Sequence, residues 1–219
     1  MKRIVPAILT DNKKDFNQKI EICKKFTDYV QIDIMNNTLT SSKSVLPKDF
    51  FYTDFGDLKF EAHIMADKKS SEEIIASLKS FPSCVRIIIH KEATESLEEL
   101  RQLLNQIKDI GKEVGVAINP DTDIREVGKV VKKISTVLFM GVNPGFYGSK
   151  FKSEVLDKVI DFKERYTLSE LEISWDGGVN KETIPQILES GAESIAVGSA
   201  IFNSENPELE YKNLVKLIS

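Results

Sequence analysis

The chain has 219 residues and a mass of 24.7 kDa, a size that suits one large domain able to bury a substantial core. Its net charge of −4 and pI near 5.4 argue against a protein that binds nucleic acid or an anionic membrane. A phosphorylated small molecule stays compatible with this charge, because a few backbone amides can hold a phosphate.

The sequence shows no signal for export or membrane insertion. The segment Met1 to Ala7 contains no long apolar region, so we expect no secretory signal. No apolar stretch approaches the ~20 residues that a membrane span needs. The two cysteines, Cys23 and Cys84, show no CxxC spacing, and we expect reduced, buried thiols. Together these features predict a cytoplasmic protein.

Short β-branched runs alternate with longer amphipathic runs along the whole chain. The pattern predicts strands at Ile4–Leu9, Tyr29–Ile34, Lys59–Ile64, Cys84–Ile89, Val114–Ile118, Thr136–Met140, Leu171–Trp175 and Ser194–Val197. It predicts helices near Lys14–Phe26, Ser71–Ser80, Ser96–Ile110, Asp123–Lys132, Ser153–Arg165, Lys181–Ser190 and Glu208–Ile218. The less regular segment from Leu46 to Phe55 is expected to hold a short additional helix.

Eight strand–helix units without a linker predict one α/β domain over residues 1–219. Strands such as Val85 to Ile89 are mostly apolar, as expected of a parallel sheet that is covered on both faces. Right-handed crossovers would close such a sheet into a (β/α)8 TIM barrel. A doubly wound open sheet is the main alternative, and eight regular units favour the closed barrel.

Three polar residues lie where short apolar runs end. They are Asp33, His63 and Asp176, each at the carboxyl end of a predicted strand. Parallel barrels assemble their active sites from the carboxyl ends of separate strands. Two carboxylates and an imidazole can bind a divalent metal and transfer protons. The sequence therefore predicts an active site at this end of the barrel.

Asp33 and Asp176 belong to the second and seventh predicted strands, so they can face each other across the barrel mouth. One carboxylate on each side of a substrate carbon permits removal of a proton from one face and its return to the other, as in an epimerase acting beside a carbonyl. A metal ion on the enediolate oxygens would stabilise the developing charge. The alternative roles are helix N-capping for a strand-end Asp and a satisfied core histidine for His63.

Other residues at the same strand ends are expected to shape the pocket. His90 ends the fourth predicted strand, and we expect it to be a satisfied core histidine or part of the pocket wall. Met35, Met65 and Met140 are expected to pack there and to line an apolar rim around a sugar.

Three glycine-containing turns follow the last three predicted strands. They are Asn143-Pro-Gly-Phe-Tyr-Gly, Asp176-Gly-Gly-Val and Val197-Gly-Ser-Ala. Loops at these positions of a barrel often hold a phosphate through backbone N–H groups, and glycine lets the anion approach closely. Phosphate binding is therefore the better interpretation of the three turns, ahead of three unrelated tight turns.

Ordered motifs along nearly the whole chain resemble the ribulose-phosphate 3-epimerase family. The motifs are Pro6-Ala-Ile-Leu, Gln31-Ile-Asp-Ile-Met-Asn-Asn, His63-Ile-Met, His90-Lys-Glu-Ala, Met140-Gly-Val-Asn-Pro-Gly-Phe-Tyr-Gly, Asp176-Gly-Gly-Val and Gly198-Ser-Ala-Ile-Phe. The resemblance implies a TIM barrel of the ribulose-phosphate binding type. It also implies an isomerase that interconverts ribulose 5-phosphate and xylulose 5-phosphate, or a related ketose phosphate, in the pentose phosphate pathway.

The resemblance implies a role for each matching position. Asp33 and Asp176 would be the acid/base pair and, with His63, the ligands of a divalent metal (Zn, Fe or Mn). The substrate and its phosphate would be bound by His63, Gly145, Phe146, Tyr147, Gly148, Gly177, Gly178, Gly198 and Ser199. The expected partner is a small-molecule sugar phosphate, and the protein is expected to form a homo-oligomer.

The chain departs from the family pattern on one side of the pocket. Gln31 stands where the family has a first metal-binding histidine, Ala7 replaces a substrate-contacting serine, and Asn36-Asn37 replaces Asp-Gly. An amide oxygen is a weaker ligand than imidazole for zinc or iron, so metal affinity should fall. Loss of the hydroxyl at position 7 should remove a hydrogen bond to the substrate that is typically worth ~1 kcal/mol.

Three functions are compatible with these residues. The first is a metal-assisted ketose-phosphate 3-epimerase, which the two retained carboxylates favour. The second is a phosphosugar-binding barrel with little or no turnover, which Gln31, Ala7 and Asn36 favour. The third is a related phosphosugar lyase or synthase, which would require a lysine in the barrel mouth that no strand end clearly supplies.

Overall fold

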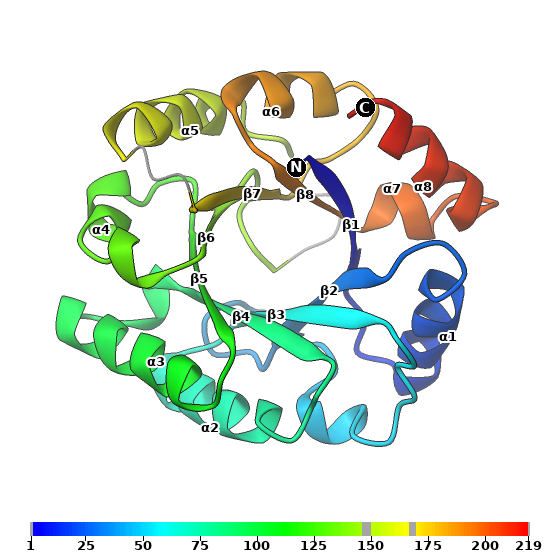
Figure 1. Cartoon of the computed structure of the whole chain (residues 1–219), viewed down its shortest axis with the longest axis horizontal. Coiled ribbons are helices and arrows are strands. Elements are labelled where there is room, and N and C mark those ends of the chain that lie inside the picture. The colour runs from blue at the N-terminus through cyan, green and yellow to red at the C-terminus, as the bar shows by residue number, and fades with distance from the viewer. Residues whose placement is uncertain (1, 146–149, 167–169, 219) are drawn as a thin grey trace.

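Eight parallel strands form a closed barrel in the computed structural model, which describes residues 2–145, 150–166 and 170–218. Each strand pairs with the next in sequence, and β8 (Ser194–Val197) returns to pair with β1 (Arg3–Ile8). Helices surround the ring of strands (Figure 1). The predicted (β/α)8 barrel is therefore confirmed, and the pairing of β1 with β8 excludes an open doubly wound sheet.

The observed elements follow the predicted order closely. The remaining strands are β2 (Tyr29–Met35), β3 (Lys59–Met65), β4 (Cys84–His90), β5 (Glu113–Ile118), β6 (Thr136–Met140) and β7 (Glu172–Asp176). The helices are α1 (Lys13–Cys23), α2 (Lys68–Leu78), α3 (Leu97–Asp109), α4 (Ile124–Gly128), α5 (Glu154–Arg165), α6 (Ile184–Ser190), α7 (Ser199–Phe202) and α8 (Pro207–Lys216). Short 3₁₀ turns are η1 (Pro47–Asp49), η2 (Lys91–Ala93) and η3 (Val131–Lys133).

Local signals explain where several helices begin. The side chain of Asn12 accepts hydrogen bonds from the backbone N–H groups of Lys14 and Asp15 at the start of α1. Ser96 does the same for α3 and Asn206 for α8, each by accepting from a backbone N–H three residues later. Such caps satisfy N–H groups that have no partner within the helix.

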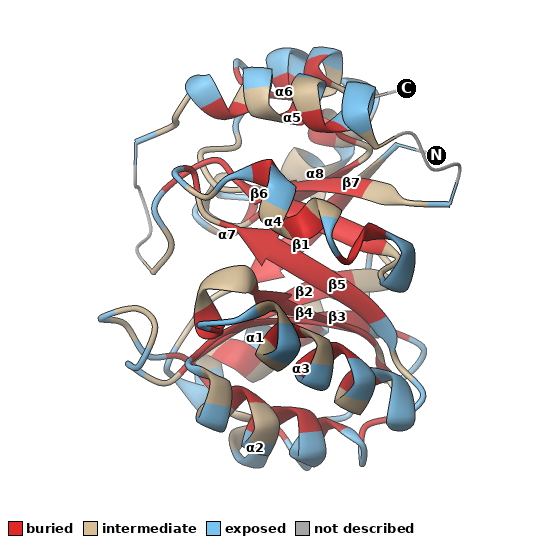
Figure 2. Ribbon diagram, turned by 90° about the vertical axis from the view of Figure 1, so that its left-hand side faces the viewer, coloured by how far each residue is buried: buried red, intermediate tan, exposed pale blue. Residues whose placement is uncertain are grey.

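Apolar side chains fill the layer between the barrel and the helices. Figure 2 shows buried residues along the strands and exposed residues on the outer faces of the helices. A separate small cluster of Ile88, Ala117, Leu138 and Met140 consists of buried strand residues.

Cys23 and Cys84 are buried and form no disulfide, and burial raises the pKa of both thiols to about 12. Among the described helices, none has the length and apolar composition needed to cross a bilayer.

Three elements differ from the prediction. The expected helix within 46–55 is only the 3₁₀ turn η1, and the expected helix at 123–132 is split into α4 and η3. The split follows Gly128, where glycine is a weak helix former and a Cβ would clash with the Tyr166 hydroxyl. The four-residue helix α7 after β8 was not predicted, because so short a segment carries no helical periodicity.

A network of charged side chains joins strands at the amino-terminal end of the barrel. Arg86 of β4 contacts Glu61 of β3 at 3.2 Å, Glu172 of β7 at 2.5 Å and Glu113 of β5 at 2.8 Å. Arg86 and Glu61 are buried, and Arg3 of β1 adds a second contact to Glu172 at 3.0 Å. The network satisfies charges that would otherwise be costly inside the fold.

Candidate active site

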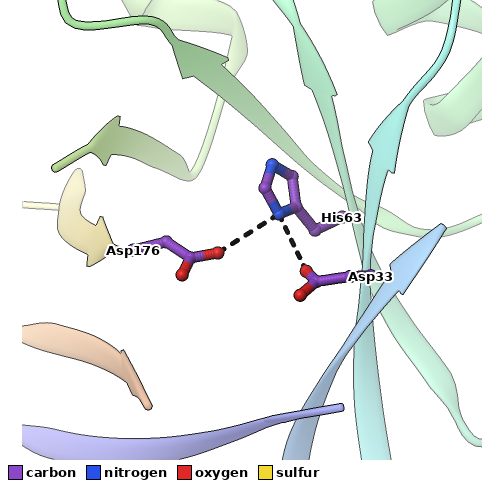
Figure 3. Close-up of side chains that lie close together, drawn as sticks. All are labelled: Asp33, His63 and Asp176. Carbon is purple, nitrogen blue, oxygen red and sulfur yellow. Dashed lines mark hydrogen bonds and ion pairs between the residues drawn. The ribbon is translucent and has the colours of Figure 1, made fainter. Parts of the chain in front are cut away.

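Asp33, His63 and Asp176 meet at the carboxyl-terminal end of the barrel. The pairing of β2 with β3 sets Asp33 directly opposite His63, and Asp176 ends β7. His63 Nδ1 lies 3.0 Å from Asp33 Oδ1 and 3.4 Å from Asp176 Oδ2. Figure 3 shows the two aspartates approaching His63 from different strands. The structure thus brings together the three side chains predicted to form the centre of the site.

Gln31 completes this group, with its amide nitrogen directed toward the carboxylates. Gln31 Nε2 donates to Asp33 Oδ1 at 2.8 Å and to Asp176 Oδ2 at 2.6 Å, and it lies 3.4 Å from His63 Nδ1. Its Oε1 is buried and has no hydrogen-bond partner among the residues that the structure describes. The sequence led us to expect an amide oxygen in this place, whereas the structure has the amide nitrogen bridging two acceptors.

The donor set fits a divalent cation. One ligand atom from each of Asp33, His63 and Asp176 lies within 4.8 Å of the other two. Carboxylate oxygens and an imidazole nitrogen suit zinc, iron or manganese. The orientation of an amide is set by the surrounding hydrogen bonds. If the Gln31 side chain turned over, its Oε1, which now lacks a partner among the described residues, would become a fourth metal ligand. Without a cation the present orientation is favoured, because the N–H groups face two carboxylates.

Burial and neighbouring charges shift the pKa values of this group. Burial, and then the charge of Asp176, raise the pKa of Asp33, while contacts with His63 and Gln31 oppose the rise. Burial by itself would lower the pKa of His63, but hydrogen bonds and charges from Asp176 and Asp33 raise it to about 9. A carboxyl group inclined to hold a proton therefore lies beside an imidazole that is also inclined to hold one.

His90 lies on the far side of His63. The two rings stack with their centroids 5.0 Å apart, and His63 Nε2 is 2.9 Å from His90 Nε2. Both side chains are fully buried. The expectation that His90 forms part of the pocket wall is therefore wrong for the described structure, because His90 packs behind His63 and away from the cavity lining.

A cavity of about 430 Å³ opens beside the two aspartates, within the range of small-molecule sites. Asp33 and Asp176 line it, together with Ala7, Met65 and Met140. The fully buried Gln31, His63 and Met35 are outside its described lining. Two of the three methionines thus form the expected apolar rim, while His63 can act on a bound molecule only through the aspartates or a shared ion.

The glycine turns converge on the same cavity. Its lining includes Gly145, Gly177, Gly178, Gly198 and Ser199. The other predicted members of this set, Phe146, Tyr147 and Gly148, lie outside the described residues. Gly178 has a φ of +69°, and an added Cβ would come within 2.9 Å of Phe151 Cβ. The backbone there has a conformation and a closeness to its neighbour that favour glycine.

The loop after β2 reaches across to the first glycine turn. Ser42 Oγ donates to the Gly145 carbonyl oxygen, and Asn36 forms an isolated bridge with Lys43. Asn37 has a φ of +69°, a conformation that asparagine tolerates better than most residues. Asparagine therefore suits the left-handed backbone of this loop.

Two supporting residues were not found by sequence reasoning. Ser44 Oγ donates to the Asp33 carbonyl oxygen at 2.6 Å and accepts from Met35 N–H at 2.8 Å, which holds the end of β2. Glu92 Oε2 lies 3.2 Å from His90 Nδ1. Glu92 belongs to the motif His90-Lys-Glu-Ala, two residues after a strand-end histidine, but the motif by itself gave it no role, whereas nothing distinguished Ser44 among neighbouring serines.

Comparison with known proteins decides the family. The model of the ribulose-phosphate 3 epimerase family matches residues 3–202. The chain belongs to the ribulose-phosphate 3-epimerase family. It is 31% identical over 211 residues to the ribulose-phosphate 3-epimerase of Bacillus subtilis (strain 168), with 94% of each chain covered. It is 30% identical over 220 residues to that of Helicobacter pylori (strain ATCC 700392 / 26695), with 97% of this chain and 96% of the relative covered.

Solved structures of other enzymes share the architecture of this epimerase-family chain. A 3-hexulose-6-phosphate synthase superposes with a TM-score of 0.68 at 17% identity over all of both chains. The orotidine 5'-phosphate decarboxylase of Pyrococcus horikoshii OT3 superposes with a TM-score of 0.66 at 14% identity over 99% of both chains. At these identities the likeness shows the fold alone.

Proposed function

We propose that this protein interconverts ribulose 5-phosphate and xylulose 5-phosphate, or a related ketose phosphate, by inverting the carbon beside the carbonyl. One observation carries the proposal. Asp33 of β2 and Asp176 of β7 line the same cavity, and both carboxylates lie within hydrogen-bond distance of one atom, Gln31 Nε2. The curated relatives, at about 30% identity over nearly the whole chain, are named ribulose-phosphate 3-epimerases.

Inversion would use the two carboxylates in opposite protonation states. An ionised carboxylate on one face removes the proton from the substrate carbon, and a protonated carboxyl on the other face returns a proton to that carbon. The raised pKa of Asp33 supports a site in which one of the two groups carries a proton. A divalent cation held by Asp33, His63 and Asp176 would stabilise negative charge on the enediolate oxygens.

The phosphate end of the substrate would lie among the glycine turns. Gly177 and Gly178 follow β7, and Gly198 and Ser199 lie at the junction of β8 with α7, on the same cavity as the aspartates. Backbone N–H groups at such turns can bind a phosphate without added positive charge. This arrangement would place the sugar carbonyl toward Asp33 and Asp176.

A phosphosugar-binding role with little turnover is the second candidate. It is favoured by one observation, the Gln31 amide that donates to both catalytic candidates at 2.8 and 2.6 Å. Those hydrogen bonds hold both carboxylates as acceptors, which disfavours proton transfer to either of them. Both functions bind the same sugar phosphate. They differ in whether the protein removes the proton from the carbon beside the carbonyl.

Solvent exchange separates the two candidates. The wild-type protein, incubated with ribulose 5-phosphate and with xylulose 5-phosphate in deuterium oxide with Zn²⁺, Fe²⁺ or Mn²⁺ supplied, should incorporate deuterium at the carbon beside the carbonyl. Asp33→Asn and Asp176→Asn should each abolish inversion, and one of them is expected to retain exchange. Asp121→Asn, at an 88% exposed side chain, is the matched control. Phosphosugar binding without exchange in the wild type would instead support the binding role.

Two further expectations belong to this proposal. A cytoplasmic, pentose-phosphate setting would supply the ketose phosphate, and the protein is expected to form a homo-oligomer. Light scattering coupled to size exclusion tests the second expectation directly, since a single species near 24.7 kDa would contradict it.

A further inference from the structure

A chain of three hydrogen-bonding side chains leads away from the proposed acid/base pair. His63 Nδ1 faces Asp33 and Asp176, His63 Nε2 lies 2.9 Å from His90 Nε2, and His90 Nδ1 lies 3.2 Å from Glu92 Oε2. His63 and His90 are fully buried, and they are the two histidines of the sequence. Glu92 belongs to the turn η2 that follows β4.

The positions of the protons in this series of hydrogen bonds follow from Glu92, the residue farthest from the two aspartates. A carboxylate can only accept hydrogen bonds, so Glu92 requires a proton on His90 Nδ1. The neutral His90 then presents a lone pair at Nε2, which requires His63 to donate from its own Nε2. His63 Nδ1 is left as the position that can hold an exchangeable proton or bind a cation.

We infer that Glu92 is a positioning residue that sets the tautomer of His63 through His90, so that His63 Nδ1 stays available to the site formed with Asp33 and Asp176. The inference deepens the proposed function and rests on it for its catalytic meaning. The hydrogen-bond chain itself is a property of the free protein. Such outer partners of a ligating histidine orient the ring and decide which nitrogen is free.

The other carboxylate oxygen of Glu92 is held by a different set of donors. Glu92 Oε1 accepts from the backbone N–H of Asn119 at 2.9 Å and from the hydroxyl of Thr122. Lys158 of α5 donates to the carbonyl oxygens of Asn119 at 3.1 Å and Pro120 at 2.6 Å, which anchors that loop. A backbone N–H can only donate, so the Oε1 position must remain an acceptor.

Because these donors hold Oε1 as an acceptor, Glu92→Gln tests the direction of the hydrogen bonds from Glu92 through His90 to His63. The amide oxygen is expected at the Oε1 position, facing Asn119 N–H, which turns the amide NH2 toward His90 Nδ1. His90 Nδ1 must then accept, so its proton moves to Nε2. His63 Nε2 must in turn accept, so it loses its proton, and the one proton left on the His63 ring lies at Nδ1, the nitrogen that faces the two carboxylates.

Nitrogen NMR on ¹⁵N-histidine-labelled protein reads the four ring nitrogens directly. In metal-free wild-type protein we expect His90 protonated at Nδ1 and bare at Nε2, and His63 protonated at Nε2. In Glu92→Gln the His90 pattern should reverse, and Nε2 of His63 should lose its proton. Glu95→Gln, which removes the same charge from an exposed residue of the neighbouring loop, should leave the spectrum unchanged. His90→Asn, which leaves His63 alone, assigns the signals.

Two results would overturn the inference. One is a wild-type His90 protonated at Nε2, and the other is an unchanged pattern of both histidines in folded Glu92→Gln. Added Zn²⁺ should move the wild-type signal of His63 Nδ1 and leave Nε2 protonated, and movement of Nε2 instead would also contradict the inference. A spectrum that Zn²⁺ leaves unchanged would count against the metal site of the proposed function, while the zinc-free spectra would still decide the tautomer.

Discussion

At the scale of single residues, Gln31 has the greatest influence on what the proposed site can do. Its amide nitrogen bridges the two aspartates, where a histidine would offer a lone pair. Gln31→His removes these donors and adds an imidazole ligand, so zinc retained after dialysis should rise. The dissociation constant for zinc should fall at least about tenfold, equivalent to about 1.4 kcal/mol.

Metal analysis and a zinc competition titration check this prediction. Gln18→His is the control, because Gln18 lies on an exposed face of α1 and a histidine there should leave the zinc content of the site unchanged. Equal zinc retention by wild type and Gln31→His would show that another feature limits the site.

Glu92 makes a second prediction at this scale, through pH. Burial would raise the pKa of Glu92, but hydrogen bonds from His90, Thr122 and Asn119 lower it to about 2, against an ordinary value of 4.5. A lowered folded-state pKa contributes stability that is complete above pH 4.5 and is lost as pH falls toward 2. The contribution at neutral pH is on the order of 3 kcal/mol.

Urea unfolding at a series of pH values measures this contribution. The difference in unfolding free energy between wild type and Glu92→Gln should be largest above pH 4.5 and should shrink steadily toward pH 2. Glu95→Gln should track the wild type throughout. A difference that does not depend on pH would mean that packing, and not the charge of Glu92, matters at this position.

At the scale of elements, the turn between β7 and α6 depends on Gly178. An alanine there would adopt a left-handed backbone at a cost of about 1–2 kcal/mol and would press its Cβ against Phe151 on the cavity wall. Gly178→Ala should therefore both lower stability and weaken binding of ribulose 5-phosphate. Bulkier side chains at this position should weaken binding further and lower stability more.

Gly111 offers a matched control for this prediction. Its φ is +75°, but an added Cβ would meet no atom of the described residues within 4 Å, and Gly111 lies before β5 at the opposite end of the barrel. Gly111→Ala should carry the same backbone cost without any loss of binding in a calorimetric titration. If both variants bound ribulose 5-phosphate equally well, the turn between β7 and α6 would not be part of the phosphate site.

At the scale of the whole molecule, the network of charged side chains at the amino-terminal end of the barrel links strands that are far apart in sequence. Arg86→Met would leave Glu61 buried without its cation, and removal of one partner of a buried pair typically costs about 3–5 kcal/mol. The midpoint of urea denaturation should fall accordingly. Arg125→Met, which breaks an exposed pair with Asp123, should change it little. A small effect at Arg86 would show that water or Arg3 replaces its contacts.

The sequence by itself determined the barrel and predicted most residues of the proposed site. Each strand is a short apolar run, the longer helices show a 3.6-residue period, and both signals depend on neighbours along the chain. A parallel barrel also places all carboxyl ends of its strands at one mouth, so Asp33, His63 and Asp176 could be grouped from their positions alone.

Only the tertiary structure decided which atoms of these residues meet. The Gln31 amide turns its nitrogen to two carboxylates from β2 and β7, and His90 lies behind His63 instead of on the pocket wall. Glu92 acquires its role from Asn119 and Thr122, about thirty residues away. Hydrogen-bond direction depends on donors and acceptors brought together by folding, and no periodicity in the sequence records them.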